Sequence, residues 1–521
     1  MPREGEHRWI RCLVFQVDPV HACELLRGEA DALQICVLGR QAPAWPSDTD
    51  RSESTQQRVR SQEGRAPALH DSMSPRALYQ RLTRLHADRL GCKLKDKVVQ
   101  IFAPHCSAGC GSAGSWLETG GVRMLGLRAR SAVVGIGESE YARHGQASAS
   151  EFELTLRAIL ASVEDAGLTV DDIDGFVSYG DDKNEPIRLA SALGIPELKL
   201  AACQWGGGGG GSAGHIALAA AGIAAGLADC VVVFKASAQG QHGRLGLGRG
   251  SYGAGEESVG YNLGGAASAP YGLFSPPQKY ALRATRMMEV GGVPRSAMRA
   301  VARAAYHHAR NNPNAVFASK SLSDAEYDES RWIAEPLHLY DCCQESDAAA
   351  AMILVAADRA RQLRHDPVYV LAAGQGGEFR AGAGAENMAH YDTGGASLLA
   401  PRLYSEAGVR PADVNVAQIY DNFTVGVILS MIDHGLCTYE NVSEVVSFDN
   451  LIAPNGAMPI NTSGGNFAEV YILGMSLHLE AVRQLRGSAR NQVPGAEICL
   501  STGGPMTALT SSAIFGSSNT V

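Results

Sequence analysis

The sequence has no long hydrophobic run, no excess of basic residues and no cysteine spacing typical of a disulfide framework. No stretch of about 18 apolar residues occurs, so we expect no membrane-spanning helix. Lys and Arg total 45 against 54 Asp and Glu, a net charge of −9, which argues against nucleic-acid binding through a basic face. The charged N-terminal residues are not followed by an apolar segment, so we expect no signal peptide.

The twelve cysteines are scattered at irregular intervals along the chain. Such spacing in a long chain is typical of the reducing cytoplasm, and we therefore expect a cytoplasmic protein. His105, Cys106 and Cys110 lie close together, but no second Cys/His pair follows at the spacing of a zinc site. We expect no metal site.

Residues 1–123 differ from the rest of the chain. Residues 47–63 are polar and rich in arginine, and residues 106–121 are mostly Gly, Ser and Cys, with no periodicity in either segment. We predict a poorly ordered tail, or translation upstream of a true start at Met124; a regulatory or docking extension is the alternative. A fragment spanning 124–521 is expected to fold on its own.

From residue 130 onward, strand patterns alternate with helix patterns, which predicts an α/β fold with parallel strand pairs. Residues 237–345 interrupt this alternation and are expected to form an inserted loop and helix subdomain that covers the substrate. We expect strands over residues 131–136, 173–178, 198–203, 230–234, 348–356, 368–373, 414–419, 496–501 and 511–515. We expect helices over residues 151–167, 187–193, 213–225, 277–291, 294–311, 396–408, 425–434 and 471–486.

One pattern occurs twice. Residues 165–179 contain Asp-Ala-Gly-Leu, Asp-Ile-Asp and a tyrosine, and residues 406–420 contain Glu-Ala-Gly-Val, Asp-Val-Asn and a tyrosine at the same spacing. The repeat predicts two similar halves, residues 124–360 and 361–521. Tyr420 should lie near the C-terminal end of a strand, the edge where ligands bind in open α/β sheets.

The first candidate site is a run of six glycines, residues 206–211, that precedes a predicted helix. Backbone N–H groups of Gly208, Gly209 and Gly210 could hold a CoA phosphate or form an oxyanion hole for a thioester. No Lys-Ser/Thr pair follows, so the run is not a P-loop. Close packing of helix against strand is the alternative explanation.

The second candidate is the segment 461–471, which contains Gly464, Gly465 and Asn466 before a predicted helix start. Its glycines offer backbone donors, and Glu469 and Tyr471 could act as an acid and base pair. A packed aromatic side chain with a satisfied hydroxyl would also explain Tyr471.

Tyr420 is the third candidate, followed by Asp421 and Asn422. Its alternative role is to cap the core at the strand end, with Asp421 and Asn422 capping the next helix. Cys203 is a lone thiol after a strand; it could be a nucleophile, although a small buried side chain is the commoner role of such a cysteine.

Five segments together resemble the thiolase superfamily, in its sterol-carrier-protein-x or lipid-transfer-protein branch, over about residues 128–521. They carry family-like motifs in the family order, at residues 166–174, 223–233, 308–315, 420–423 and 459–465. The resemblance implies two repeated halves packed as a five-layer αβαβα body, and a pocket for an acyl-CoA thioester.

The departures from the family pattern concern its catalytic residues. The family's nucleophilic cysteine would fall near Gly209, and its second cysteine near Ser501 or Thr502, with Cys499 out of register. Tyr420 and Tyr471 stand where the branch has histidines. Without a thiol no acyl-enzyme forms. The pattern is similar to that of the cysteine-free aldolases that cleave steroid side chains.

This resemblance implies retro-aldol cleavage of a β-hydroxyacyl-CoA that releases propionyl-CoA and a ketone. Tyr420, Tyr471, Asp421 and Glu469 would be catalytic, and coenzyme A would enter as part of the substrate, with no permanently bound cofactor. The resemblance also implies a homodimer and a partner with an OB-fold and a zinc ribbon. Two alternatives remain: a thiolase-type acyltransferase using Cys203 or another thiol, and a non-catalytic subunit that binds acyl-CoA.

Overall fold

The computed structural model describes residues 126–521 except residues 181, 243–268, 274 and 380–390. The expected extension 1–123 and much of the inserted loop therefore lie outside the described residues. Among the residues described, no helix is long and apolar enough to cross a membrane. No group of three or more His, Cys, Asp or Glu side chains within the same residues could hold a metal ion.

The described strands form one large mixed sheet with the order β10-β11-β12-β9-β1-β8-β5-β3-β4, with β2 pairing beside β8. The strands of the first half are β1 (Ser131–Glu138), β2 (Ala142–Arg143), β3 (Gly175–Tyr179), β4 (Leu200–Gln204), β5 (Cys230–Ala238) and β8 (Ser346–Ala356). Those of the second half are β9 (Val368–Gly376), β10 (Val416–Gln418), β11 (Ile498–Thr502) and β12 (Thr510–Gly516). These bounds match the expected strands closely.

The two halves repeat one arrangement. β8 is antiparallel to β1 and β5, and β12 is antiparallel to β9 and β11, so each half closes on one reversed strand. β3 pairs parallel with both β4 and β5; likewise β10 pairs parallel with β11, and an isolated parallel bridge joins Ala417 to Ile460. β1 pairs with β9 through Ala132 and Tyr369, which joins the halves into one sheet.

The sequence repeat corresponds to a repeated turn. Helix α4 (Glu151–Ala166) ends at Gly167 with φ 69°, and helix α13 (Leu399–Ala407) ends at Gly408 with φ 67°. Both glycines adopt the left-handed conformation that commonly ends a helix, and glycine does so without the steric cost of a Cβ atom. In the next turn, Asp172 accepts from the backbone N–H of Thr169 at 2.9 Å, and Asp413 accepts from that of Arg410 at 2.8 Å. The expected α/β fold with two similar halves is confirmed.

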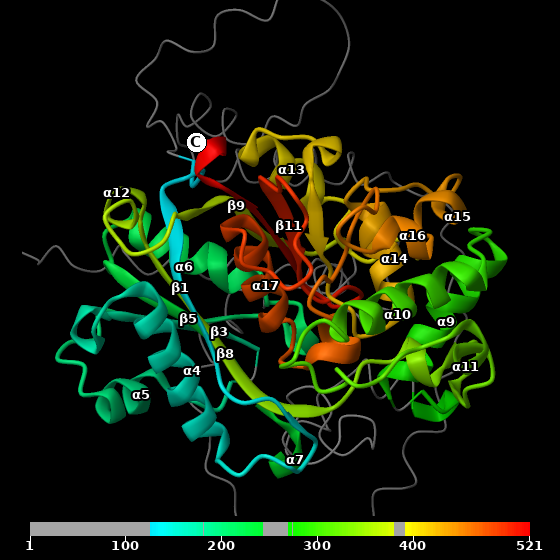
Figure 1. Ribbon diagram of the computed structural model, residues 1–521, viewed down its shortest axis with the longest axis horizontal. Helices are drawn as coiled ribbons and strands as arrows, with labels where there is room; N and C mark the ends of the chain where they lie inside the picture. The colour runs from blue at the N-terminus through cyan, green and yellow to red at the C-terminus, as the bar shows by residue number, and fades with distance from the viewer. Residues whose placement is uncertain (1–125, 181, 243–268, 274, 380–390) are drawn as a thin grey trace, which may run out of the picture. The chain divides into compact units, whose positions relative to one another are not determined.

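Two helices, α6 (Gly214–Ala224) and α17 (Met475–Arg486), each contact strands of both halves (Figure 1). Helix α4 packs on β1, β5 and β8, and α13 packs on β9 and β12, on the outer faces. The packing is close: a Cβ atom at Gly137 would lie 2.2 Å from the backbone N of Ser162 in α4. This explains the high glycine and alanine content.

The inserted segment adds α9 (Pro276–Glu289), α10 (Arg295–Ala309), α11 (Asp324–Asp328) and a hairpin of β6 (Trp332–Ala334) and β7 (Leu337–His338). Helices α9 and α10 pack against α14 (Thr424–Asp433), beside α15 (Val442–Val445) and α16 (Phe448–Leu451) (Figure 1). Their buried side chains join the main hydrophobic cluster of the core. The described part of the insertion is thus continuous with the body.

The helix expected over residues 471–486 was wrong at its start. A single π-helical turn occupies Gly465–Glu469, Val470 is extended with φ −162°, and α17 begins only at Met475. Glycines at 464, 465 and 474 adopt φ of 112°, 56° and 91°. These conformations interrupt a regular helix, so Tyr471 lies in a connecting segment and not in a helix.

Candidate active site

Two buried phenols meet where the two candidate segments converge. Tyr420 follows β10 by two residues, and Tyr471 lies between the π-turn and α17. Their hydroxyl oxygens are 3.0 Å apart, a hydrogen bond in which either can donate, and the rings meet edge to face with centroids 6.5 Å apart. Both side chains are at most 2% exposed. Because a donated hydrogen bond stabilises a phenolate, either tyrosine lowers the cost of ionising the other.

The ring of Tyr420 fills the space beside the glycine run. A Cβ atom at Gly209 would lie 2.3 Å from the Cε2, Cζ and hydroxyl oxygen of Tyr420, and one at Gly474 would lie 2.5 Å from its Cδ2. Gly209 has φ +88°, a conformation that L side chains rarely adopt. A cysteine side chain therefore has no room at the position where the family resemblance expects the nucleophile.

The remainder of the glycine run is held by packing between the halves. The carbonyl of Gly209 accepts from the backbone N–H groups of Ser212 at 3.0 Å and Gly504 at 2.8 Å. The carbonyl of Gly210 accepts from the Ser511 hydroxyl at 2.6 Å. The run turns through the 3-10 segment Gly207–Gly209, and α6 starts five residues later, at Gly214. Close packing thus accounts for the carbonyl side of this turn.

Hydroxyl side chains hold the backbone of both tyrosines. The backbone N–H of Tyr420 donates to Thr502 Oγ1 at 3.0 Å. The backbone N–H of Tyr471 donates to Ser346 Oγ at 2.7 Å, and that hydroxyl donates to the carbonyl of Tyr471 at 3.3 Å. Thr502 ends β11 and Ser346 begins β8, so each tyrosine is anchored to a strand of the large sheet.

Asp421 faces the loop that carries Tyr471. Its Oδ1 accepts from the backbone N–H of Asn466 at 2.9 Å. Burial raises the pKa of Asp421 to about 7, opposed by hydrogen bonds from Asn466 and Asn461. The described hydrogen bonds of this carboxyl thus join the turn after β10 to the π-turn, and they do not include a phenol.

Glu469 points into a different buried group. Its Oε1 accepts from Asn312 Nδ2 at 2.9 Å, and its Oε2 accepts from the Ser463 hydroxyl at 2.6 Å. Burial raises the pKa of Glu469 to about 8, assisted by the negative charge of Glu138 and opposed by Arg483. The structure therefore brings Tyr420 and Tyr471 together, whereas the two carboxyls hold the loop between them from either side.

Glu469→Gln is expected to be more stable than the native chain at alkaline pH. A carboxyl whose pKa is raised by folding, from about 4.3 in the unfolded chain, stabilises fully only below that value. This stabilisation is lost as pH rises through about 8. Between pH 5 and 9 the native chain should lose on the order of 3 kcal/mol of unfolding free energy relative to Glu469→Gln. Denaturant unfolding of both proteins across this range checks the prediction, and parallel pH curves would contradict it.

The segment 461–470 uses its glycines for close contacts. A Cβ atom at Gly464 would lie 2.8 Å from Ala309 Cβ in α10, and one at Gly465 would lie 2.3 Å from Asp421 Oδ2. The backbone N–H of Asn466 is already bonded to Asp421. The side-chain amide of Asn466 is buried and has no hydrogen-bonding partner among the described residues. Any ligand contact by Asn466 would thus come from this amide.

Two residues of this region were not expected from the sequence as site residues. Cys343 is partly buried and packs against the cluster of Tyr420, Tyr471 and Leu477, and burial raises the pKa of its thiol well above the usual range. Tyr179, the repeat counterpart of Tyr420, donates its hydroxyl to the carbonyl of Leu473 at 2.6 Å. The repeat pointed to Tyr179, but no local pattern marks Cys343, because its contact arises from residues 77 and more positions away in the chain.

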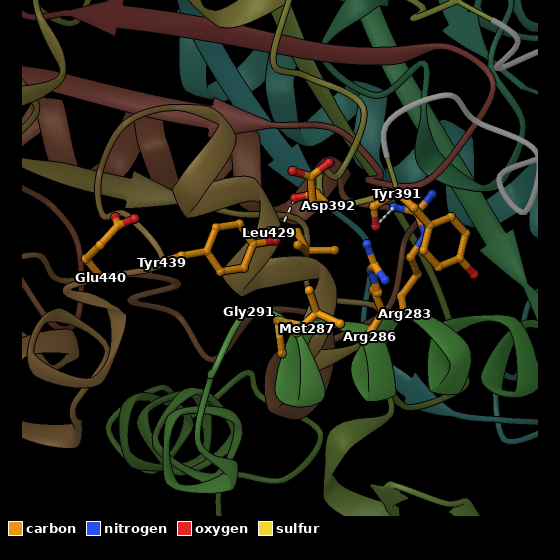
Figure 2. A pocket seen from close by; sticks show the side chains of 10 residues that line it. Arg283, Arg286, Met287, Gly291, Tyr391, Asp392, Leu429, Tyr439 and Glu440 are labelled. Atoms are coloured by element: carbon orange, nitrogen blue, oxygen red, sulfur yellow. Dashed lines mark hydrogen bonds between the residues drawn. The ribbon is translucent and has the colours of Figure 1, made fainter.

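A cavity of about 440 Å³ is lined by residues of α9 together with Tyr391, Asp392, Tyr439 and Glu440 (Figure 2). Tyr280 in α9 accepts a hydrogen bond from Asn422 at 2.8 Å, whereas Arg283 and Arg286, further along the helix, line the cavity. Arg283 lies over the ring of Tyr391 at 3.8 Å and donates to its carbonyl at 2.9 Å. Neither Tyr420 nor Tyr471 lines this cavity.

Comparison with known proteins identifies related chains. The model of the family described as thiolase C-terminal domain-like matches residues 377–517. The chain is 36% identical to the 17-hydroxy-3-oxo-4-pregnene-20-carboxyl-CoA lyase of Mycobacterium tuberculosis, over 73% of this chain and 97% of that protein. It is 35% identical to a steroid side-chain-cleaving aldolase of Thermomonospora curvata, over 71% and 94%.

A solved structure named Ltp2-ChsH2(DUF35) aldolase superposes with a TM-score of 0.69 at 34% identity, covering 75% of this chain and 98% of that chain. Sequence identity above 30% over nearly the whole length of these relatives, together with the two-half fold, leaves one assignment. The chain belongs to the thiolase superfamily, in the group of the steroid side-chain-cleaving aldolases.

Proposed function

We propose that this enzyme cleaves the β-hydroxyacyl-CoA side chain of a steroid by a retro-aldol reaction, releasing propionyl-CoA and a ketone. The observation that carries the proposal is the buried phenol pair at 3.0 Å beside a nucleophile position that Tyr420 fills. The relatives named as a pregnene-carboxyl-CoA lyase and a steroid side-chain-cleaving aldolase support the substrate class. CoA enters as part of the substrate, and no resident cofactor is needed for this chemistry.

One phenol, as phenolate, removes the proton of the β-hydroxyl group. The Cα–Cβ bond then breaks, Cβ becomes the ketone carbonyl, and the bonding electrons form the thioester enolate. The other phenol protonates Cα, which completes propionyl-CoA. A proton shared across the 3.0 Å hydrogen bond then restores the starting state of the pair. The mechanism consumes no free CoA and needs no thiol.

In this proposal the remaining candidate residues position the reaction. Asp421 and Glu469 hold the loop that carries Tyr471, and Gly209, between Gly208 and Gly210, borders the Tyr420 ring. The second turn, with Gly464, Gly465 and Asn466, contacts the thioester. The Asn466 side-chain amide, which has no hydrogen-bonding partner in the part of the chain that the structure describes, is a suitable donor for it. The insertion 237–345, which belongs to the first half (124–360), covers the substrate, and the second half spans 361–521.

We also propose a cytoplasmic homodimer that binds a partner with an OB-fold and a zinc ribbon. The similar solved structure, named as an Ltp2 aldolase with ChsH2(DUF35), supports such a partner. The dimer is supported by β4, which ends the strand order of the described sheet and exposes Ala201, Cys203 and, next to it, Trp205 at 83%. An apolar, unprotected edge strand is a template for pairing with another chain.

The test uses the full chain, alone and with whatever co-purifies, and a steroid β-hydroxyacyl-CoA. We expect ketone and propionyl-CoA to appear in equal amounts without added CoA. Acyl transfer that depends on free CoA would instead support a thiolase-type acyltransferase. Binding of the substrate without turnover, in both preparations, would support a non-catalytic acyl-CoA-binding subunit.

Removal of thiols is expected to leave activity nearly unchanged. Cys203 is exposed and donates to the Gly180 carbonyl at 3.2 Å, and the Cys343 thiol stays protonated because burial raises its pKa. The Cys343 thiol is therefore not a poised thiolate. The Cys203→Ala/Cys343→Ala protein should keep kcat within about threefold. A tenfold loss would mean that roughly 1.4 kcal/mol of transition-state stabilisation had been removed. A loss beyond tenfold in a folded variant would favour the acyltransferase.

A further inference from the structure

Each phenol-bearing residue is fixed by one hydroxyl side chain, and the two hydroxyls come from different halves of the sheet. Ser346 begins β8 in the first half, and Thr502 ends β11 in the second. β10 pairs with β11 only as far as Gln418 and Ser501. Beyond that pair, Thr502 Oγ1 takes the backbone N–H of Tyr420 at 3.0 Å and thus replaces a rung of the ladder.

Ser346 binds both backbone groups of Tyr471, accepting from its N–H at 2.7 Å and donating to its carbonyl at 3.3 Å. Ser346, Thr502 and Tyr420 are completely buried or nearly so, so water cannot replace a lost contact cheaply. The separation of the phenols is therefore set by two strands, one in each half. A rotation of either tyrosine backbone would break the 3.0 Å contact between the hydroxyls.

We propose that Ser346 and Thr502 are positioning residues that hold the two phenols in the geometry needed for proton transfer. The proposal rests on the function proposed above, and it assigns a new role to position 502. Thr502 stands near the expected place of the family's second cysteine, and here its hydroxyl binds a backbone amide. Cys343 is the titratable side chain described as packing against the pair, and its raised pKa keeps its thiol neutral.

The test compares Thr502→Val, which has the same shape without the hydroxyl, with Thr502→Ser, which retains it. Ser346→Ala removes the second clamp. Ser139→Ala is the matched control. Ser139 Oγ accepts from the backbone N–H of Ala349 in β8 at 2.9 Å, and its hydrogen bonds within the described residues involve neither Tyr420 nor Tyr471. A displacement of about 1 Å costs roughly 10²-fold in rate. We expect Thr502→Val and Ser346→Ala to lose about tenfold or more in kcat with KM within about twofold.

Two further measurements separate positioning from general stability. The pH–rate profile should shift to higher pH in Thr502→Val and Ser346→Ala. The ultraviolet titration of the phenols, taken as the difference from Tyr420→Phe, should shift in the same direction. Thr502→Ser and Ser139→Ala should leave both profiles unchanged, even where Ser139→Ala lowers Tm as much as Thr502→Val or Ser346→Ala does. Unchanged profiles in Thr502→Val, or an equal shift in Ser139→Ala, would overturn the proposal. If the native chain cleaves no β-hydroxyacyl-CoA, the function fails, and the phenol titration still decides the positioning role.

Discussion

Tyr420→Phe and Tyr471→Phe are each expected to lower kcat by roughly 10²- to 10⁴-fold, the usual cost of losing a general acid or base. Each substitution removes one hydroxyl and leaves the ring that fills the site. The loss should fall on kcat more than on KM, because the proton transfers occur in the transition state. Steady-state kinetics with a steroid β-hydroxyacyl-CoA measures both parameters.

The double variant should be little worse than either single variant, because the two phenols act as one unit through their 3.0 Å hydrogen bond. Tyr404→Phe is the matched control: Tyr404 is also buried, and its hydroxyl donates to the His434 carbonyl at 2.9 Å. It should lose about 1 kcal/mol of stability and keep its activity. Full activity in both single variants would exclude the phenols from the chemistry.

The order of elements could be predicted from the sequence because short-range patterns determine it. One such pattern is a turn that follows Gly167 in the first half and again follows Gly408 in the second. Asp172 and Asp413 stabilise these turns by hydrogen bonds to the backbone three residues earlier. The π-turn at Gly465–Glu469 could not be predicted in the same way. Its conformation depends on Gly465 packing against Asp421, a residue 44 positions earlier, and no helical period marks it.

The candidate site was predictable in its tyrosines and less so in its surroundings. Tyr420 and Tyr471 stand out in the sequence because they replace histidines at motif positions, whereas the 3.0 Å contact between them follows from the fold. The orientation of Asp421 and Glu469 depends on which side of the 461–470 loop each faces. Their raised pKa values arise from burial, which sequence neighbours alone do not determine.

Gly209→Ala is expected to reduce kcat about 10²-fold although it adds a single methyl group. The new Cβ would lie 2.3 Å from two ring carbons and the hydroxyl oxygen of Tyr420, far inside van der Waals contact. Gly209 cannot move away easily, because its carbonyl is bonded to both Ser212 and Gly504. The ring of Tyr420 must therefore shift, and the 3.0 Å bond to Tyr471 is the contact that it loses.

Gly226→Ala provides the matched control for the backbone. Gly226 has φ +70° and open space where a Cβ would lie, whereas Gly209 has φ +88° and the Tyr420 ring there. Both alanines carry the cost of a left-handed conformation, about 1–2 kcal/mol. Both variants should therefore lose stability, measured by denaturant unfolding, but only Gly209→Ala should lose activity and shift the phenol titration.

Tyr420→Phe also separates the two causes of lost activity at Gly209. In that background the phenol pair is already broken, so Gly209→Ala should add little further loss of kcat, while its cost in stability should remain. An additive loss of activity would mean that Gly209 contributes through its own backbone, as an oxyanion donor for the thioester would. The double-variant cycle thus decides whether the glycine run in this enzyme binds the substrate or makes room for the ring of Tyr420.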